Sequence, residues 1–338
     1  MKTSRIALTT LLALGLTACS VTGTNEVMKP AEQRSGFMGL SVADDIKVER
    51  EGPFKGVQQV AVASFKVGFV HGKIESRKAG RGFGGMSSAG IKLKGVAQEN
   101  MQAITDAAYA DFVSRMKQAG YEIVDRQTLK AQPDFAKARP EASPQIKEAS
   151  FFGDKTEMTT LAPSSHGDFY WFDGESIGNS GGFGFANAST AAMTQYGKTG
   201  IKVLSVYYVI DFAGADGYGG TFRTTSSVKV GQALTLAPGG GISIFGGDGR
   251  VVANHFSHIK LGQPLYAEEA FGEVVNTSSD AAVGVETGLN VVRALAGLGT
   301  SQRRDFEVQA NAARYDALAR DLLAQANGKL VERMASLR

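Results

Sequence analysis

The first eighteen residues constrain the fold most, because they send the rest of the chain out of the cytoplasm. Lys2 and Arg5 form a short basic head, and an apolar run follows from Ile6 to Leu16. This order is typical of a secretory signal peptide, and the run is shorter than the roughly 20 apolar residues that a spanning helix needs. Cys19 is the only cysteine of the chain. The exported part therefore has no internal disulfide and must be stabilised by a packed core.

The residues Leu16-Thr17-Ala18-Cys19 resemble the lipobox of bacterial lipoproteins. The resemblance implies that Cys19 is diacylated, becomes the first residue of the mature chain and gains a third acyl group. Ser20 resembles the second residue of lipoproteins sent to the outer membrane, so we expect a lipid-anchored outer-membrane protein whose main domain faces the periplasm. A plain signal peptide with a chance cysteine is the alternative. We predict a signal peptide over 1–18, a lipidated tether over 19–50 and a folded domain over 51–338.

Charge and glycine content narrow the class of protein. The chain has 36 lysines and arginines and 33 aspartates and glutamates, so removing Lys2 and Arg5 leaves 34 against 33, a net charge of +1. A net charge so close to zero does not indicate a basic surface that binds nucleic acid, and we expect no nucleic-acid partner. Glycine accounts for 42 of 338 residues, against roughly 7% in average proteins. The excess gathers in 68–95, 174–200 and 214–249, which favours hairpins and mobile loops over a compact enzyme.

The apolar patterns predict an α+β fold. Residues 57–65 and 201–212 read as strands, the first of them buried on both faces. Met101 to Ala119 carries apolar residues at steps of three or four, which predicts a helix closed by Gly120 as a left-handed cap. Residues 66–94 are predicted to form a long basic, glycine-rich loop. The remaining predicted elements are strands at 121–125, 168–177, 221–236 and 250–261 and C-terminal helices at 278–298 and 306–334.

No group of residues in the sequence indicates an active site. Gly174-Glu175-Ser176-Ile177-Gly178 matches the nucleophile elbow of serine hydrolases, but Asn179-Ser180-Gly181-Gly182 follows where that motif needs a helix. His255 and His258 fall on opposite faces of a predicted strand, so they cannot share a metal ion there. Gly80 to Gly85 lacks the spacing of a dinucleotide turn and the ending of a P-loop. We therefore expect no enzymatic activity, no cofactor and no metal.

The order of elements and several short patterns resemble the CsgG family of curli-secretion lipoproteins over roughly residues 55–300. The most specific pattern is Glu286-Thr287-Gly288 in its context. The other patterns are Val60 to Phe65, Phe112 to Leu129, Phe172 to Gly178, Ile201 to Phe212, Glu273 and Val285.

Membership of that family would imply a homo-oligomeric ring in which each subunit gives two long glycine-rich β-hairpins to one outer-membrane β-barrel. Open sheet edges are not tolerated in hydrocarbon, so such hairpins would have to pair between subunits. The hairpins would lie near 178–200 and 222–262. In the second, the alternating residues Val228, Val230, Leu234 and Leu236 would form a lipid-facing row, which Gln232 interrupts.

The same resemblance implies a loop between the first strand and the first helix that narrows the pore. In this chain that stretch is longer and basic, and Phe83, Lys78 and Arg81 are the candidate pore-loop residues. A positively charged loop in a channel would suit an acidic client.

Three functions follow from these patterns. The leading hypothesis is a non-enzymatic outer-membrane lipoprotein that forms an oligomeric secretion pore for extracellular fibre or adhesin subunits. The alternative is a peripheral periplasmic lipoprotein that binds and regulates a cell-envelope partner without forming a pore. A third hypothesis is a lipid-anchored hydrolase that uses Ser176.

Overall fold

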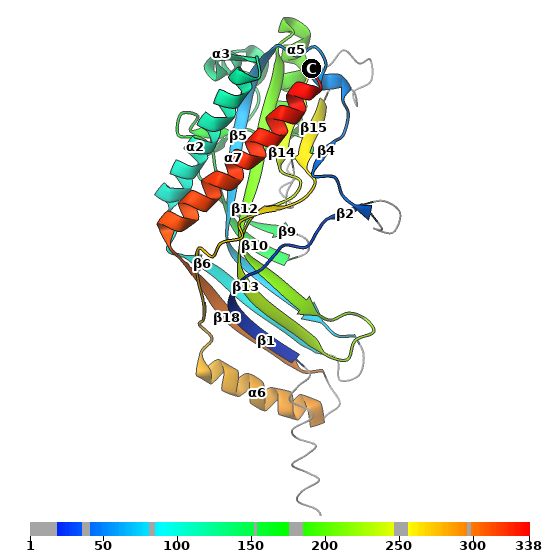
Figure 1. Ribbon diagram of the computed structural model, residues 1–338, viewed down its shortest axis with the longest axis vertical. Coiled ribbons are helices and arrows are strands. Elements are labelled where there is room, and N and C mark those ends of the chain that lie inside the picture. Colours follow the sequence, from blue (N-terminus) through cyan, green and yellow to red (C-terminus); the bar gives the residue numbers. More distant parts are fainter. Residues whose placement is uncertain are drawn as a thin grey trace, which may run out of the picture.

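The computed structural model describes residues 19–35, 41–80, 85–151, 154–175, 185–246, 256–295 and 299–338. These residues form one large mixed sheet with helices on both of its faces and a further helix at one end (Figure 1). The prediction of a mixed α and β fold is confirmed at this level.

The centre of the sheet is β5 (Gln59–Lys78), whose side chains are buried from Val60 to Val70. Such a continuous buried run is typical of a strand that is covered on both faces. β5 pairs in parallel with β12 (Lys202–Tyr218) and β7 (Glu122–Val124). It pairs antiparallel with β10 (Asp154–Leu161) and β6 (Met86–Lys94).

The sheet divides where β12 separates from β5, beyond the pair Ile210 and Phe69. One branch continues from β12 to β13 (Ser226–Leu236) and then to β1 (Cys19–Val27), which lies parallel to β13. The other branch continues from β5 to β6, β18 (Ser301–Ala310) and β17 (Gly272–Asn276). β1 also contacts β6, β17 and β18, so the two branches enclose an apolar interior at the lower end of Figure 1.

The other strands extend the sheet at its upper end or form small separate pairs. They are β14 (Gly241–Phe245), β15 (Phe256–Leu261), β4 (Ile46–Val48), β9 (Gln145–Phe151), β16 (Leu265–Tyr266), β2 (Arg34–Ser35), β3 (Ser41–Val42), β8 (Glu141–Ala142) and β11 (Asp168–Phe169). The 3-10 turn η2 (Gly52–Phe54) precedes β5.

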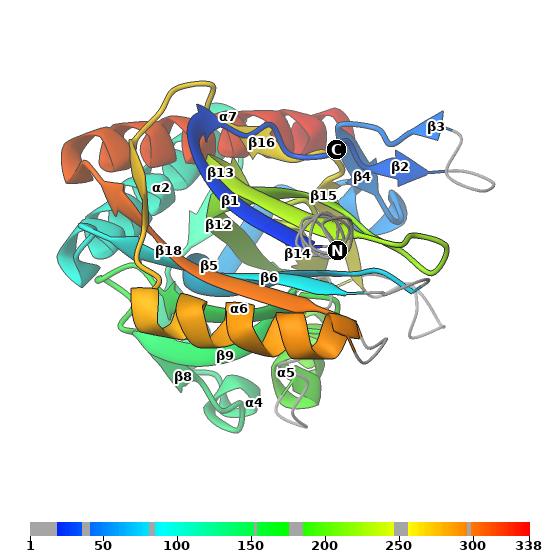
Figure 2. The same cartoon turned by 90° about the horizontal axis from the view of Figure 1, so that it is seen from below.

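Two long helices, α2 (Gln98–Gln118) and α7 (Ala312–Ser336), lie side by side on one face of the sheet (Figure 1). The opposite face packs against α3 (Arg126–Lys130), α4 (Pro133–Ala136) and α5 (Phe185–Thr199). α6 (Asp280–Leu295) crosses the lower end of the molecule, beside β18 (Figures 1 and 2). Gly120 follows α2 with φ of 82°, so the predicted left-handed cap is confirmed.

Several segments differ from the sequence predictions. Residues 66–94, predicted as a loop, form the second part of β5 and the whole of β6, apart from 81–84, which lie outside the described ranges; Val67 to Val70 and Ser87 to Ala89 are buried there. Residues 185–199, placed in the first hairpin at 178–200, form helix α5, whose residues Ala188, Ala191 and Ala192 pack into the core. Residues 178–184 of that hairpin lie outside the described ranges.

The predicted tether over 19–50 also contains paired strands, since β1 and β4 both belong to the large sheet. The last helix begins later than predicted, because residues 301–310 pair with β6 and β17. None of the helices within the described ranges is both long and apolar enough to cross a membrane.

Candidate functional site

Cys19, the predicted lipid acceptor, is the first residue of β1 and lies level with Ser226 of β13. Its Sγ atom lies 3.5 Å from the hydroxyl of Ser226 and 3.4 Å from the carbonyl oxygen of Thr300, just before β18. The thiol is half-buried. Cys19 therefore belongs to a strand of the large sheet, and no length of free chain separates the acceptor from the folded domain.

The chain segments around Cys19 are hydrogen-bonded to one another at the lower end of the sheet. We call this region the rim; it contains Lys78, Met86, Ser87, Gly220, Ser226 and Thr300. The amide of Met86 donates to Thr300, and the hydroxyl of Ser87 donates to the carbonyl of Ser226. The amide of Gly220 donates to the carbonyl of Lys78, which joins the end of β5 to the turn after β12. The rim consequently brings the ends of the two longest hairpins, β5–β6 and β12–β13, to the position of the cysteine.

Large apolar and aromatic side chains are exposed on this rim. Phe222 is 74% exposed and Tyr218 is 44% exposed, both next to the turn between β12 and β13. The guanidinium carbon of Arg223 lies 4.6 Å from the centroid of the Tyr218 ring, and the guanidinium donates to the phenol oxygen at 2.7 Å. Lys78, one of the three candidate pore-loop residues, is exposed at the end of β5. Phe83 and Arg81 lie outside the described residues.

The residues of the predicted lipid-facing row on β13 are buried in this conformation of the protomer, and the row stays a prediction for an assembled barrel. Val228, Val230, Leu234 and Leu236 are each at most 1% exposed and belong to the main core. The alternation that predicted a membrane strand is real, but the apolar face of β13 is covered by the protein's own second branch.

Gln232, which interrupts this row, is a buried connection between three strands. Its side-chain oxygen accepts from the amides of Phe271 and Gly272, and its amide group donates to the carbonyls of Asn25 and Gly272. All of the polar capacity of this side chain is used within the domain, so Gln232 fits a buried position between β13, β1 and β17.

A buried lysine lies in the middle of the sheet. The Nζ atom of Lys66 donates to Glu175 at 3.0 Å, to Ser205 at 2.8 Å and to the carbonyl of Tyr170 at 2.9 Å. It also lies 3.0 Å from the hydroxyl of Ser64. Burial lowers the pKa of Lys66, and the carboxylate of Glu175 offsets part of that effect.

A serine beside a lysine of lowered pKa is a known arrangement for nucleophilic catalysis. Here Ser64, Lys66 and Ser205 are all 0% exposed, so a substrate has no access to them in this conformation. The lysine is a structural counterion for Glu175, the second residue of the elbow-like pattern. Sequence reasoning assigned Lys66 to a basic loop; its position within an apolar strand was the signal that could have placed it inside. Ser176 itself lies outside the described residues.

Of the two histidines on the predicted strand, only His258 lies within the described residues. His258 is buried and shares a hydrogen bond of 2.7 Å with the hydroxyl of Ser243, while His255 lies outside the described ranges. Burial lowers the pKa of His258 to about 4. Within the part of the chain that the structure describes, no three histidine, cysteine, aspartate or glutamate side chains are grouped to hold a metal ion.

A surface cleft of about 350 Å³ lies between α2 and the start of α3. Tyr109, Lys117, Arg126 and His166 line it, together with apolar side chains. Burial, followed by the charge of Arg126, lowers the pKa of His166 to about 4, so this histidine is neutral at pH 7. Arg126 is held by the carboxylate of Asp168, and the acidic side chain of Asp125 also lines the cleft.

No known protein family matches the chain, and neither the curated proteins nor the solved structures contain a match to it. The similarity to the CsgG family therefore rests on the residues given above.

Proposed function

We propose that this protein is a non-enzymatic lipoprotein of the outer membrane whose periplasmic domain binds another component of the cell envelope. The observation that carries the proposal is the position of Cys19 within β1, where it pairs with Ser226 at the lower end of the sheet. An acyl group on this residue would hold the lower end of the sheet against the bilayer and leave the helical end, with α2, α3 and α7, facing the periplasm.

Burial of β13 supports a role that does not require a pore. A strand of an outer-membrane barrel presents alternate residues to lipid, whereas Val228, Val230, Leu234 and Leu236 lie in the core of a single protomer. In this conformation the domain has a complete apolar interior and needs no other subunit to cover these residues.

The test is the behaviour of the protein without its lipid. A chain with Cys19→Ala behind a cleavable signal should be exported, dissolve without detergent and elute from a sizing column at the mass of one protomer. A matched control with Ser35→Ala keeps the lipid and should stay with the membrane fraction. If the unlipidated protein needs detergent and migrates as a large ring, the peripheral role is wrong.

A secretion pore for extracellular fibre or adhesin subunits is the second candidate. It is favoured by the meeting of the β5–β6 and β12–β13 turns beside Cys19, and by the resemblance carried by Glu286-Thr287-Gly288. To form a pore, each subunit would have to release some of its buried strands from its own core, so that they could pair with strands of identical neighbouring subunits. Electron microscopy of the detergent-extracted complex tests this candidate, and unchanged export in a Lys78→Glu, Arg81→Glu variant would count against a charged pore loop.

A further inference from the structure

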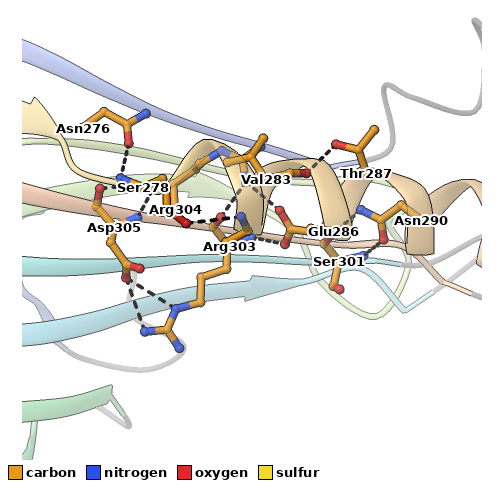
Figure 3. A network of polar contacts seen from close by, with 12 residues as sticks. Asn276, Ser278, Val283, Glu286, Thr287, Asn290, Ser301, Arg303, Arg304 and Asp305 are labelled. Atoms are coloured by element: carbon orange, nitrogen blue, oxygen red, sulfur yellow. Dashed lines mark hydrogen bonds and ion pairs between the residues drawn. The ribbon is translucent and has the colours of Figure 1, made fainter.

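Helix α6 turns its polar face toward the protein. The carboxylate of Glu286 accepts from the amide of Arg303 and from the guanidinium of Arg304, each at 2.6 Å. Asn290 exchanges two hydrogen bonds with the backbone of Ser301, at 2.5 and 2.9 Å (Figure 3). These contacts hold α6 along β18 through polar groups.

An adjacent face of α6 is apolar and exposed. Val285 is 66% exposed, Leu289 is 53% exposed and Val292 is 63% exposed. The spacing of these three residues, i, i+4 and i+7, places them on one stripe of the helix. The neighbouring exposed positions are small: Ala281, Ala282, Gly284 and Gly288. A surface helix of a globular protein normally buries its apolar stripe, so the orientation of α6 is inverted.

The inverted helix lies beside the predicted lipid acceptor. The thiol of Cys19 contacts the carbonyl of Thr300 at 3.4 Å, and the next residue, Ser301, is the one that Asn290 and Arg293 bind. The C-terminal part of α6 is thus fixed to the same short segment as the cysteine. Figures 1 and 2 show α6 lying across this end of the molecule, with β18 between it and the body.

We infer that the exposed face of α6 lies in the phospholipid surface of the membrane that holds the acyl chains of Cys19. This inference rests on the proposed lipid anchor. An interfacial helix buries its apolar face about 5–10 Å into the boundary between headgroups and acyl chains, and the stripe from Val285 to Val292 extends about 10 Å along the helix. Arg293 follows the stripe on α6 and is exposed, so its guanidinium group can meet lipid phosphates.

A lipid surface fits this face better than a second copy of the chain. A stable protein interface buries about 1,200–2,000 Å² in total. The three side chains Val285, Leu289 and Val292 supply only a small part of such an area. Contact with a bilayer does not require a minimum apolar area on the protein, because the acyl chains on Cys19 already supply the attachment. The helix adds a second point of contact, which prevents the domain from rotating about a single anchor.

The experiment uses a reporter on the helix of the full-length, lipidated protein. Because acylation occupies the thiol of Cys19, Leu289→Cys provides a single reactive thiol for an environment-sensitive dye. Ile146→Cys is the matched control, since Ile146 is an apolar side chain that is 67% exposed on β9. Both proteins are reconstituted in vesicles of phosphatidylethanolamine and phosphatidylglycerol, and the acylation of Cys19 is checked by mass spectrometry.

We expect aqueous iodide to quench the dye at 289 several-fold less than the dye at 146, and doxyl-labelled acyl chains to quench only the dye at 289. Equal iodide quenching at the two positions, in acylated protein that floats with the vesicles, overturns the inference and leaves the anchor intact. Protection from iodide without quenching by the labelled lipids also overturns it, because a protein then covers the helix. Unacylated protein that does not float overturns the anchor and the inference together.

Discussion

Replacing Glu175 with glutamine should destabilise the domain through the lysine that it leaves behind. The carboxylate of Glu175 is the acidic partner of Lys66, at 3.0 Å, and both side chains are at most 2% exposed. The three other groups around the ammonium are hydroxyls and a carbonyl, which carry no charge. Glutamine keeps the size of the side chain and removes only the negative charge.

Removing one partner of a buried ion pair costs about 3–5 kcal/mol, because the remaining charge loses its compensation. A domain of ordinary stability unfolds with about 5–15 kcal/mol, so Glu175→Gln should remain folded at pH 7 with a clearly lower denaturation midpoint. Glu273→Gln, on an exposed residue of β17, is the control and should stay within about 0.5 kcal/mol of the wild type.

The loss should depend on pH in a defined direction. Burial lowers the pKa of Lys66 and Glu175 counteracts that effect, so removing the carboxylate lowers the pKa further. Below the pKa of the unfolded lysine, about 10.4, unfolding then takes up a proton, and the free energy of unfolding rises by about 1.4 kcal/mol per pH unit. The loss of stability in Glu175→Gln, relative to the wild type, should therefore shrink as the pH rises toward about 10.4.

The assay is urea denaturation at several pH values, followed by tryptophan fluorescence. A second variant isolates the charge: Lys66→Met added to Glu175→Gln should be more stable than Glu175→Gln alone, since an apolar side chain of similar length needs no counterion. A loss below about 1 kcal/mol, or a deficit that does not change with pH, would refute the reasoning.

Three further predictions concern the core. Burial lowers the pKa of His258 from 6.5 to about 4, so the neutral histidine contributes its full stability above pH 6.5, and about 3 kcal/mol of that stability is lost as the pH falls toward 4. His258→Gln should remove this part of the acid sensitivity. If the free energy of unfolding falls equally steeply in the variant and the wild type from pH 7 to 4.5, the prediction is contradicted. Asn327 of α7 accepts from the phenol of Tyr208 and donates to the carbonyl of Ala108, so Asn327→Leu should cost about 1–3 kcal/mol by leaving these groups unpaired; a variant of wild-type stability would show that the bridge between α7, α2 and β12 is dispensable. Leu234→Ala on β13 should cost about 2–5 kcal/mol by opening a cavity, whereas the same change at the exposed Leu289 should have little effect on unfolding, and equal losses would mean that β13 is not in the core in solution.

The central elements were predictable because their patterns are local. The apolar run of β5, the stripe of α2 and its cap at Gly120 depend on residues that are close in sequence, and the structure contains all three. The hairpin from β5 to β6 was read as a loop, because glycines and lysines dominate it and its partners, β10 and β18, come much later in the chain. Lys66 was misread for the same reason, since its counterion lies 109 residues away.

By itself, the sequence predicted an export signal. It also determined that a single cysteine is present, which excludes an internal disulfide, and the two periods, near two and near 3.6, that build the strands and helices. Only the tertiary structure decided what covers each apolar face. The alternation on β13 and the stripe on α6 predict an apolar face equally well, yet the first is buried in the core and the second points outward beside Cys19. A repeat near two or near 3.6 residues shows only that one face of a strand or helix is apolar. Whether protein or lipid covers that face depends on residues far away in the chain.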